Sequence, residues 1–155
     1  MSFRVLGLPA SSFQSLVGLS DAALRDRGVE VHVADEKPGF PCRVSLVDAE
    51  PGERVLLLNF EHQPAETPYR SAHAIFVREG ATEAALPADT LAPVFVGRLL
   101  SVRAFDAAGA MLDADVVQGT EAAATFERLL ADPRAAYLHV HNAKRGCYAA
   151  RVERA

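Results

Sequence analysis

Short apolar runs separated by polar turns extend along most of this 155-residue chain. In residues 29–33, valines alternate with polar side chains, which is the period of a half-buried strand. Residues 53–60 contain three consecutive leucines, which is typical of a strand covered on both faces. Short turns separate most of these runs, so we expect the strands to pair antiparallel. The predicted strands are residues 3–8, 29–33, 43–47, 53–60, 72–78, 98–105, 110–117, 136–141 and 147–152.

Two further segments carry the signals of a helix N-terminus. Ser20 is the predicted N-cap of a helix over residues 21–27, because a serine hydroxyl can accept a hydrogen bond from the first turn. Thr120 is the predicted N-cap of a second helix, over residues 121–131. Together with the strands, these segments predict a single α+β domain over residues 1–155, with a mainly antiparallel sheet and two or three helices.

The composition excludes some classes of function. The chain has 16 basic and 20 acidic residues and a net charge of −4. An acidic chain is a poor nucleic-acid binder, because that affinity depends on neutralising phosphates. No window approaches the roughly 20 apolar residues of a membrane span. We therefore predict no nucleic-acid partner and no membrane partner, and the lack of a cleavable apolar signal predicts a cytoplasmic protein with reduced cysteines.

The densest group of chemically useful side chains lies in residues 139–151. Side chains on a strand alternate between its two faces, so Tyr137, His139 and His141 should share one face. Histidines two positions apart on a strand stand about 6.6 Å apart, and such a pair can hold zinc or iron if a third ligand joins it. Candidates for that third ligand are His62, Cys42 and Cys147. None stands at a recognisable spacing from the pair, so we predict no stoichiometric structural metal and no cofactor.

Cys42 is the stronger of two candidate nucleophiles. It follows a loop with two prolines and precedes Arg43, and a nearby cation favours the reactive thiolate. Cys147 opens a strand with apolar neighbours, so we expect Cys42 to react faster with an alkylating reagent. The candidate catalytic residues are therefore Cys42 as a nucleophile and His139 and His141 as acid or base.

A second group of side chains suits an anion. Residues 134–155 hold five of the 16 basic residues but only one of the 20 acids. The turn from Asn142 to Gly146 carries Lys144 and Arg145, and basic side chains with free backbone amides attract phosphate or carboxylate. A hairpin turn with solvated bases is the simpler interpretation. The candidate ligand-binding residues are Arg43, His62, Tyr69, Arg70, His73, Asn142, Lys144, Arg145 and Cys147.

Two blocks of the sequence resemble a known family. The first includes Pro41-Cys-Arg-Val-Ser-Leu46 and His73-Ala-Ile-Phe-Val77, and the second runs from His139 to Arg151. They resemble a bacterial family catalogued as domain of unknown function 1203, over nearly the whole chain. The resemblance implies no activity, because none is assigned to that family. One departure is Phe60, where the resemblance leads us to expect tyrosine, so a hydroxyl there is not essential to this protein.

Three functions remain open from the sequence. The first is a small-molecule site, for binding or for catalysis on an anionic metabolite, built from the Cys42 segment, the polar loop after residue 60 and the final hairpin. The second is a non-enzymatic protein-interaction or structural module that uses the polar hairpin. The third is a mononuclear metal site that uses the paired histidines.

Overall fold

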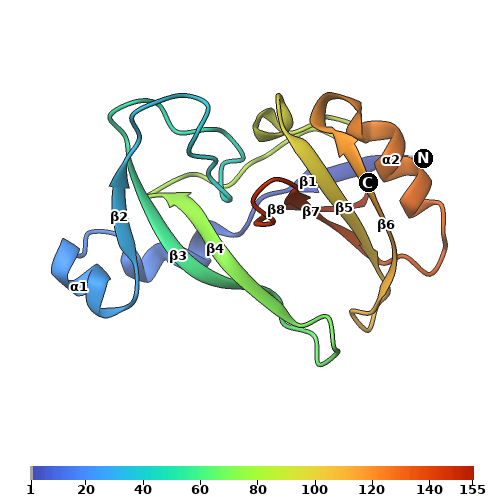
Figure 1. Ribbon diagram of the computed structural model, residues 1–155, viewed down its shortest axis with the longest axis horizontal. Coiled ribbons are helices and arrows are strands. Elements are labelled where there is room, and N and C mark those ends of the chain that lie inside the picture. Colours follow the sequence, from blue (N-terminus) through green and yellow to red (C-terminus); the bar gives the residue numbers. More distant parts are fainter. Residues whose placement is uncertain (1) are drawn as a thin grey trace.

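The strands form two antiparallel sheets in the computed structural model, which describes residues 2–155. The larger sheet has five strands in the order β1-β8-β7-β5-β6, and the smaller has three in the order β2-β3-β4. Figure 1 shows the two sheets next to each other, the smaller with α1 at one end of the molecule and the larger with α2 at the other. The strands are β1 (Phe3–Leu6), β2 (Glu30–Val33), β3 (Arg54–Gln63), β4 (Ser71–Arg78), β5 (Leu99–Phe105), β6 (Met111–Gln118), β7 (Tyr137–Asn142) and β8 (Tyr148–Arg154).

Helices occupy a smaller part of the described chain. The α-helices are α1 (Asp21–Asp26) and α2 (Ala122–Leu130), and the short 3₁₀ helices are η1 (Ala10–Leu16), η2 (Pro93–Phe95) and η3 (Gly119–Glu121). These elements confirm the predicted α+β class with antiparallel strands. The division of the strands into two sheets is a detail that the strand pattern does not specify. Within residues 2–155, no helix combines the length and the apolar character that a membrane crossing requires.

Most of the predicted elements are present, and two local predictions are wrong. The Ser20 hydroxyl accepts a hydrogen bond from a backbone amide of the first turn of α1 at 3.1 Å, as predicted. Residues 43–47 form a turn and not a strand, because the amide of Leu46 bonds to the carbonyl of Cys42 and Leu46 has a φ of 57°. Thr120 does not cap α2, because it lies inside η3 and α2 begins without a side-chain cap. A short apolar run fits a buried turn as well as a strand, which explains the first error.

One face of the five-stranded sheet packs against α2. Strand β7 contributes Leu138 and Val140 to this core, and α2 contributes Phe126, whose ring meets that of Phe3 edge-on at 5.3 Å. Because side chains alternate along a strand, Tyr137, His139 and His141 point to the other face of the sheet. The face away from α2 therefore carries the polar groups of β7.

A second hydrophobic cluster joins the two sheets. It contains Ile75 and Val77 from β4, Tyr148 from β8, and Cys42 from the segment between β2 and β3. Tyr148 is 3% exposed, so the start of β8 is packed against the smaller sheet. This contact positions the end of β7 and the start of β8 next to the smaller sheet.

An ion pair fixes the long segment between β2 and β3. Arg98 donates hydrogen bonds to both carboxylate oxygens of Asp48, at 2.7 and 2.9 Å, and the amide of Gly39 donates to Asp48 at 3.2 Å. Burial disfavours the ionised carboxylate, but the hydrogen bonds and charge of Arg98 outweigh burial, so the pKa of Asp48 is lowered. The segment that carries Cys42 is thereby attached to the larger sheet.

We predict that Asp48→Asn lowers the free energy of unfolding by about 2 kcal/mol at neutral pH, because a two-pronged charged hydrogen bond is lost. The folded-state pKa of Asp48 lies below the value of about 3.9 for an unfolded aspartate. Its contribution is therefore complete above that unfolded value and disappears as the pH falls through the folded-state pKa. Urea unfolding of both proteins over an acid series measures this. A stability difference that stays constant down the series would contradict the prediction.

Candidate metal centre

Strand β7 presents a row of rings on the face away from α2. Tyr137, His139 and His141 alternate with Leu138 and Val140, which lie in the core below. The alternation predicted from the sequence is present. The two histidines are 3% and 1% exposed, whereas Tyr137 is partly exposed, so it is the two histidine rings that are covered. Side chains from another part of the protein must therefore cover these two histidine rings.

A bulge in β3 brings His62 over this row. Phe60 pairs with His73 of β4, but the register has shifted by one residue at Gln63. A bulge of this kind turns a side chain away from the direction that regular alternation would give it. Beyond the bulge, the side-chain amide of Gln63 donates to the hydroxyl of Tyr137 at 2.9 Å. This bond attaches the end of β3 to the larger sheet.

A second bulge, in β8, places Tyr148 beside the histidines. Strands β7 and β8 pair regularly as far as Ala150, but His141 then pairs with Tyr148, so Ala149 is an extra residue. In a regular ladder Ala149 would stand opposite His141, and a methyl group would replace the phenol ring. The Tyr148 ring stacks on that of His62, with centroids 5.4 Å apart and an interplanar angle of 9°.

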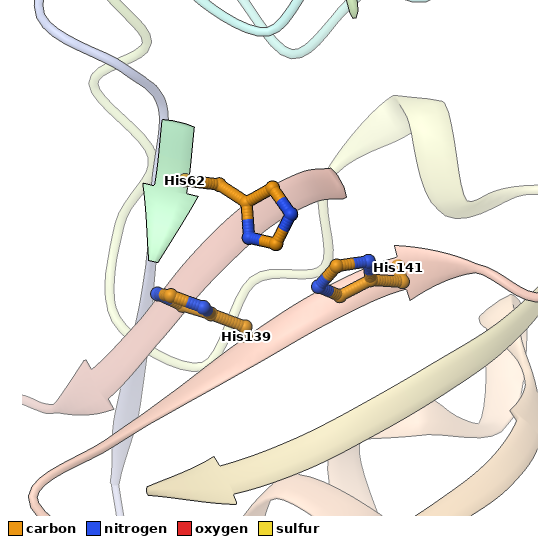
Figure 2. A group of neighbouring side chains, drawn as sticks. All are labelled: His62, His139 and His141. Atoms are coloured by element: carbon orange, nitrogen blue, oxygen red, sulfur yellow. The ribbon is translucent and has the colours of Figure 1, made fainter. Parts of the chain in front are cut away.

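Three histidine rings therefore meet at the junction of the two sheets. The His62 ring lies edge-on to both rings of β7, with its centroid 4.8 Å from that of His141 and 6.0 Å from that of His139. One ring nitrogen from each residue lies within 4.8 Å of the corresponding nitrogens of the other two. Figure 2 shows His62 entering from the end of β3, above His139 and His141 of β7.

Each ring has one buried nitrogen without a hydrogen-bond partner in residues 2–155. These nitrogens are Nδ1 of His62, Nδ1 of His139 and Nε2 of His141. The Nδ1–H of His141 donates to the carbonyl of Gly146 at 2.9 Å, which leaves the lone pair on Nε2 free. His62 is partly exposed as a residue, although its Nδ1 is buried. In the tautomers of His62 and His139 that carry their proton on Nε2, three lone pairs are available in one small volume.

Burial keeps the three imidazoles neutral at neutral pH. It lowers the pKa of His62 to about 4 and the pKa values of His139 and His141 to about 3, because a buried ring resists taking up charge. The positive charge of Arg103 lowers all three further, whereas the hydrogen bond to Gly146 partly opposes the change at His141. Neutral imidazole is the form that binds metal ions.

The three nitrogens suit a transition-metal ion. A tetrahedral zinc ion with bonds of about 2.0–2.1 Å holds its nitrogen ligands about 3.4 Å apart. The nitrogens here lie within 4.8 Å of one another, so side-chain rotations that move them by about an ångström would bring them to that spacing. In the described chain, the group includes no carboxylate and no cysteine. A tetrahedral ion would therefore keep one position for another ligand.

Arg43, a candidate anion-binding residue, lies buried beneath the final hairpin. It is 2% exposed, and its three nitrogens already donate to the carbonyl of Tyr148 at 2.8 Å, the carbonyl of Pro41 at 2.6 Å and the Sγ of Cys147 at 3.1 Å. These contacts join the turn after Cys42 to the start of β8. They give Arg43 a structural role in holding the hairpin.

Both cysteines are buried free thiols. Cys42 is 1% exposed and Cys147 is 7% exposed, so Cys42 is the less accessible of the two. The Cys42 sulfur accepts hydrogen bonds from the backbone amides of Ser45 at 3.5 Å and Arg78 at 3.3 Å. Neither sulfur belongs to the histidine group. Faster reaction of Cys42 stays a prediction, although its position after a loop does not expose its sulfur. A cytoplasmic location also stays a prediction.

Several other candidate residues lie on the surface. Tyr69 is 42% exposed, and Arg70 pairs with Glu61 at 3.1 Å. Lys144 and Arg145 are exposed at the tip of the final hairpin. Tyr69 meets the ring of Phe105 edge-on, with centroids 6.4 Å apart, and Phe105 in turn contacts His139, so Tyr69 borders the histidine group through Phe105.

His73 and Asn142 lie at the margins of the site. A ring nitrogen of His73 is 3.0 Å from the carbonyl of Ala74, and the charge of His73 helps to lower the pKa of His62 after burial and Arg103. The side-chain amide of Asn142 donates to the Sγ of Cys147 at 3.4 Å, which helps to hold the final turn.

Sequence reasoning missed two side chains of this face, Arg103 and Tyr148. Arg103 of β5 pairs with His139 across the sheet, and Tyr148 stacks on His62. Strand alternation shows which residues of one strand share a face. It does not show which other strand is the neighbour, or at what register, so no local signal connects Arg103 with His139.

We predict that Arg43→Met lowers the free energy of unfolding by about 3 kcal/mol, because two buried carbonyls and a thiol lose their donor. The control is Arg145→Ala at the exposed turn, which should change it by less than about 0.5 kcal/mol. Chemical denaturation of the three proteins gives both values. An Arg43→Met variant as stable as the wild type would show that the hairpin does not depend on Arg43.

A family model matches most of the chain. The family is described as "Protein of unknown function (DUF1203)", and the match covers residues 39–154. His62, His139 and His141 all lie inside the matched region. No curated protein and no solved structure matches the chain.

Proposed function

Because the chain belongs to the DUF1203 family, whose description assigns no activity, we propose from the site alone that it binds one divalent transition-metal ion through His62, His139 and His141. The observation that carries the proposal is the set of three buried nitrogens, one from each ring. One nitrogen of each ring lies within 4.8 Å of a nitrogen of the other two, and each ring has a buried nitrogen without a hydrogen-bond partner in the described chain. Three protein ligands and one free position are the arrangement of catalytic zinc sites.

The energetics favour an ion over a purely aromatic cluster. A buried polar group without a partner costs about 1–3 kcal/mol. Packing of the rings of His62 and Tyr148 accounts for the burial of ring carbons, but it provides nothing for the nitrogen lone pairs. One ion shared by three lone pairs would compensate all three losses at once.

The ligand types favour zinc. Imidazole ligands suit zinc, copper, nickel and iron, whereas magnesium and calcium prefer oxygen ligands. The group lacks the carboxylate that accompanies two histidines in many non-haem iron sites. Zinc also has no preferred geometry of its own, so it accepts the directions that β3 and β7 impose.

This proposal replaces the expectation from the sequence that the histidine pair stays free of metal. That expectation depended on the lack of a third ligand at a recognisable spacing. His62 is the third ligand, and it comes from the other sheet through the bulge in β3. It was among the candidates for the third ligand, but no spacing in the sequence distinguished it from the two cysteines.

The free position supports the small-molecule function among the three hypotheses. A zinc ion in such a site acts as a Lewis acid and makes a bound water acidic enough to ionise near neutral pH. The chain's own residues orient the ligands: the carbonyl of Gly146 fixes the tautomer of His141, and the ring of Tyr148 supports His62. A small molecule would bind here at the ion, and not at the buried Cys42–Arg43 segment.

We predict that the protein, made without a histidine tag and stripped with a chelator, binds one zinc ion per chain. Zinc at a hundredfold excess over its Kd should add about 2.7 kcal/mol to the free energy of unfolding. Replacing His62, His139 or His141 with Ala should weaken binding by at least about a hundredfold, since groups that only orient a ligand are already worth 10–100-fold. Calorimetric titration and elemental analysis measure affinity and stoichiometry.

The matched control is His32→Ala. His32 lies on β2, its side chain is 41% exposed, and it is paired with Glu30, so its removal should leave zinc binding unchanged. Circular dichroism identifies any variant that has not folded. The proposal is contradicted if the folded wild type binds no zinc. It is also contradicted if zinc binding survives the loss of each of the three histidines in turn.

A further inference from the structure

Strand β5 places a cation beside the three histidines. In the ladder between β5 and β7, Arg103 stands opposite His139 and Ser101 stands opposite His141. Side chains of directly opposite residues lie on the same face of a sheet, with Cβ atoms about 4.5–5.5 Å apart. Arg103 and Ser101 therefore emerge on the face that carries the histidine rings.

The guanidinium of Arg103 has spare hydrogen-bonding capacity. Its Nε donates to the hydroxyl of Ser101 at 3.2 Å, and no carboxylate of the described chain forms an ion pair with it. Its side chain is only partly exposed. The two terminal nitrogens form the forked edge that binds carboxylates, and no acceptor in residues 2–155 uses that edge.

The other arginine beside His139 differs in this respect. Arg151 of β8 stands opposite His139 on the side away from β5. Its guanidinium lies 3.9 Å from the centre of the Tyr137 ring, and its Nε donates to Glu153 at 2.6 Å. The charge of Arg151 is therefore neutralised by a partner, whereas that of Arg103 is not.

Positive charges act on the three histidines, and no carboxylate of the described chain belongs to the histidine group. Burial is the largest cause of the lowered pKa values of all three rings, and Arg103 contributes to each of them, although Arg151 contributes more than Arg103 at His139. A divalent ion held by three neutral imidazoles keeps its full charge, because the ligand set has no carboxylate or thiolate. The free position on such an ion would therefore be strongly attractive to an anion.

We propose that Arg103 binds the carboxylate of a small monoanionic substrate whose oxygen occupies the free position on the metal ion. This inference rests on the proposed metal function and names the class of ligand that the site takes. A planar carboxylate matches the guanidinium fork. With one oxygen on the fork and the other on the ion, a carboxylate uses both binding groups at once, which favours a small carboxylate as the ligand.

The surroundings of Arg103 fit the rest of such a ligand. Phe105, two residues further along β5, stacks with Tyr137 at 5.5 Å, and its centroid lies 5.1 Å from that of His139. Phe105 is 3% exposed and Tyr137 is partly exposed, so Tyr137 is the ring of this pair that is open to the hydrocarbon part of a small organic acid. A surface hollow of about 380 Å³, lined by residues including Phe13 and Val77, contains none of the three histidines and is not part of this site.

The test uses the full chain loaded with cobalt(II), whose visible spectrum reports changes in its ligands. Sodium acetate is the carboxylate probe, sodium phosphate the doubly charged probe and imidazole a neutral ligand for the metal. Acetate should change the spectrum of the wild type at lower concentration than phosphate. Arg103→Met should weaken acetate binding by about 10- to 100-fold, the loss expected for a charged hydrogen bond, and leave imidazole binding unchanged.

Two further variants distinguish direct contact between Arg103 and the carboxylate from a general effect of positive charge. Arg103→Lys keeps the charge without the fork, so it should recover only part of the acetate affinity and also provides a variant with little change in packing. Arg151→Met removes the neutralised arginine on the other side of His139, and it should change acetate affinity by less than about threefold. Ionic strength is held constant throughout.

The outcomes distinguish this inference from the proposal beneath it. Failure of the folded wild type to bind cobalt or zinc overturns the metal function, and this inference with it. If the metal binds stoichiometrically but Arg103→Met leaves the acetate affinity unchanged, the inference alone is overturned. An equal loss in Arg103→Met and Arg151→Met also overturns it, because a general field would then account for anion binding. Phosphate binding more tightly than acetate overturns the assignment of the ligand class.

Discussion

The packing of α2 on one face of the five-stranded sheet is the constraint on which the candidate site depends. It commits Leu138 and Val140 of β7 to the core. Because a strand alternates, the same packing commits His139 and His141 to the opposite face. A shift of one residue would exchange the two sets, moving imidazoles into an apolar core and leucine to the sheet junction. The free-energy cost of that exchange keeps β7 in its register, with the two histidines at the sheet junction.

Two β-bulges bring side chains to the histidine pair that regular strand pairing would not place there. The bulge in β3 turns His62 toward β7, and the bulge in β8 brings Tyr148 to stack on it. Both bulges lie at the junction of the sheets. There, a hydrogen bond from Gln63 to Tyr137 and a shared hydrophobic cluster hold the sheets together. The position of His62 and its support by Tyr148 therefore depend on how the sheets dock, and the proposed ion would in turn link one sheet to the other.

Three arginines differ in whether acceptors of the described chain already use the hydrogen-bond donors of their guanidinium groups. Arg43 is buried with an acceptor for each of its nitrogens, and Arg98 grips Asp48 with two hydrogen bonds. Both join segments that are distant in the sequence, and neither has a free guanidinium edge for a ligand. Arg103 bonds only to a serine hydroxyl in the described chain. Type and charge are the same in all three, so unused hydrogen-bonding capacity identifies the one suited to bind a ligand.

The sequence by itself determined the α+β class, the position of most strands, the Ser20 cap and the shared face of His139 and His141. Each follows from local backbone geometry, since strand alternation and helix capping involve residues a few positions apart. Only the tertiary structure decided that His62 joins the pair and that Arg103 lies beside it. These outcomes depend on sheet order, register and bulges, which are set by burial summed over strands distant in the chain, and no short stretch of sequence encodes that sum.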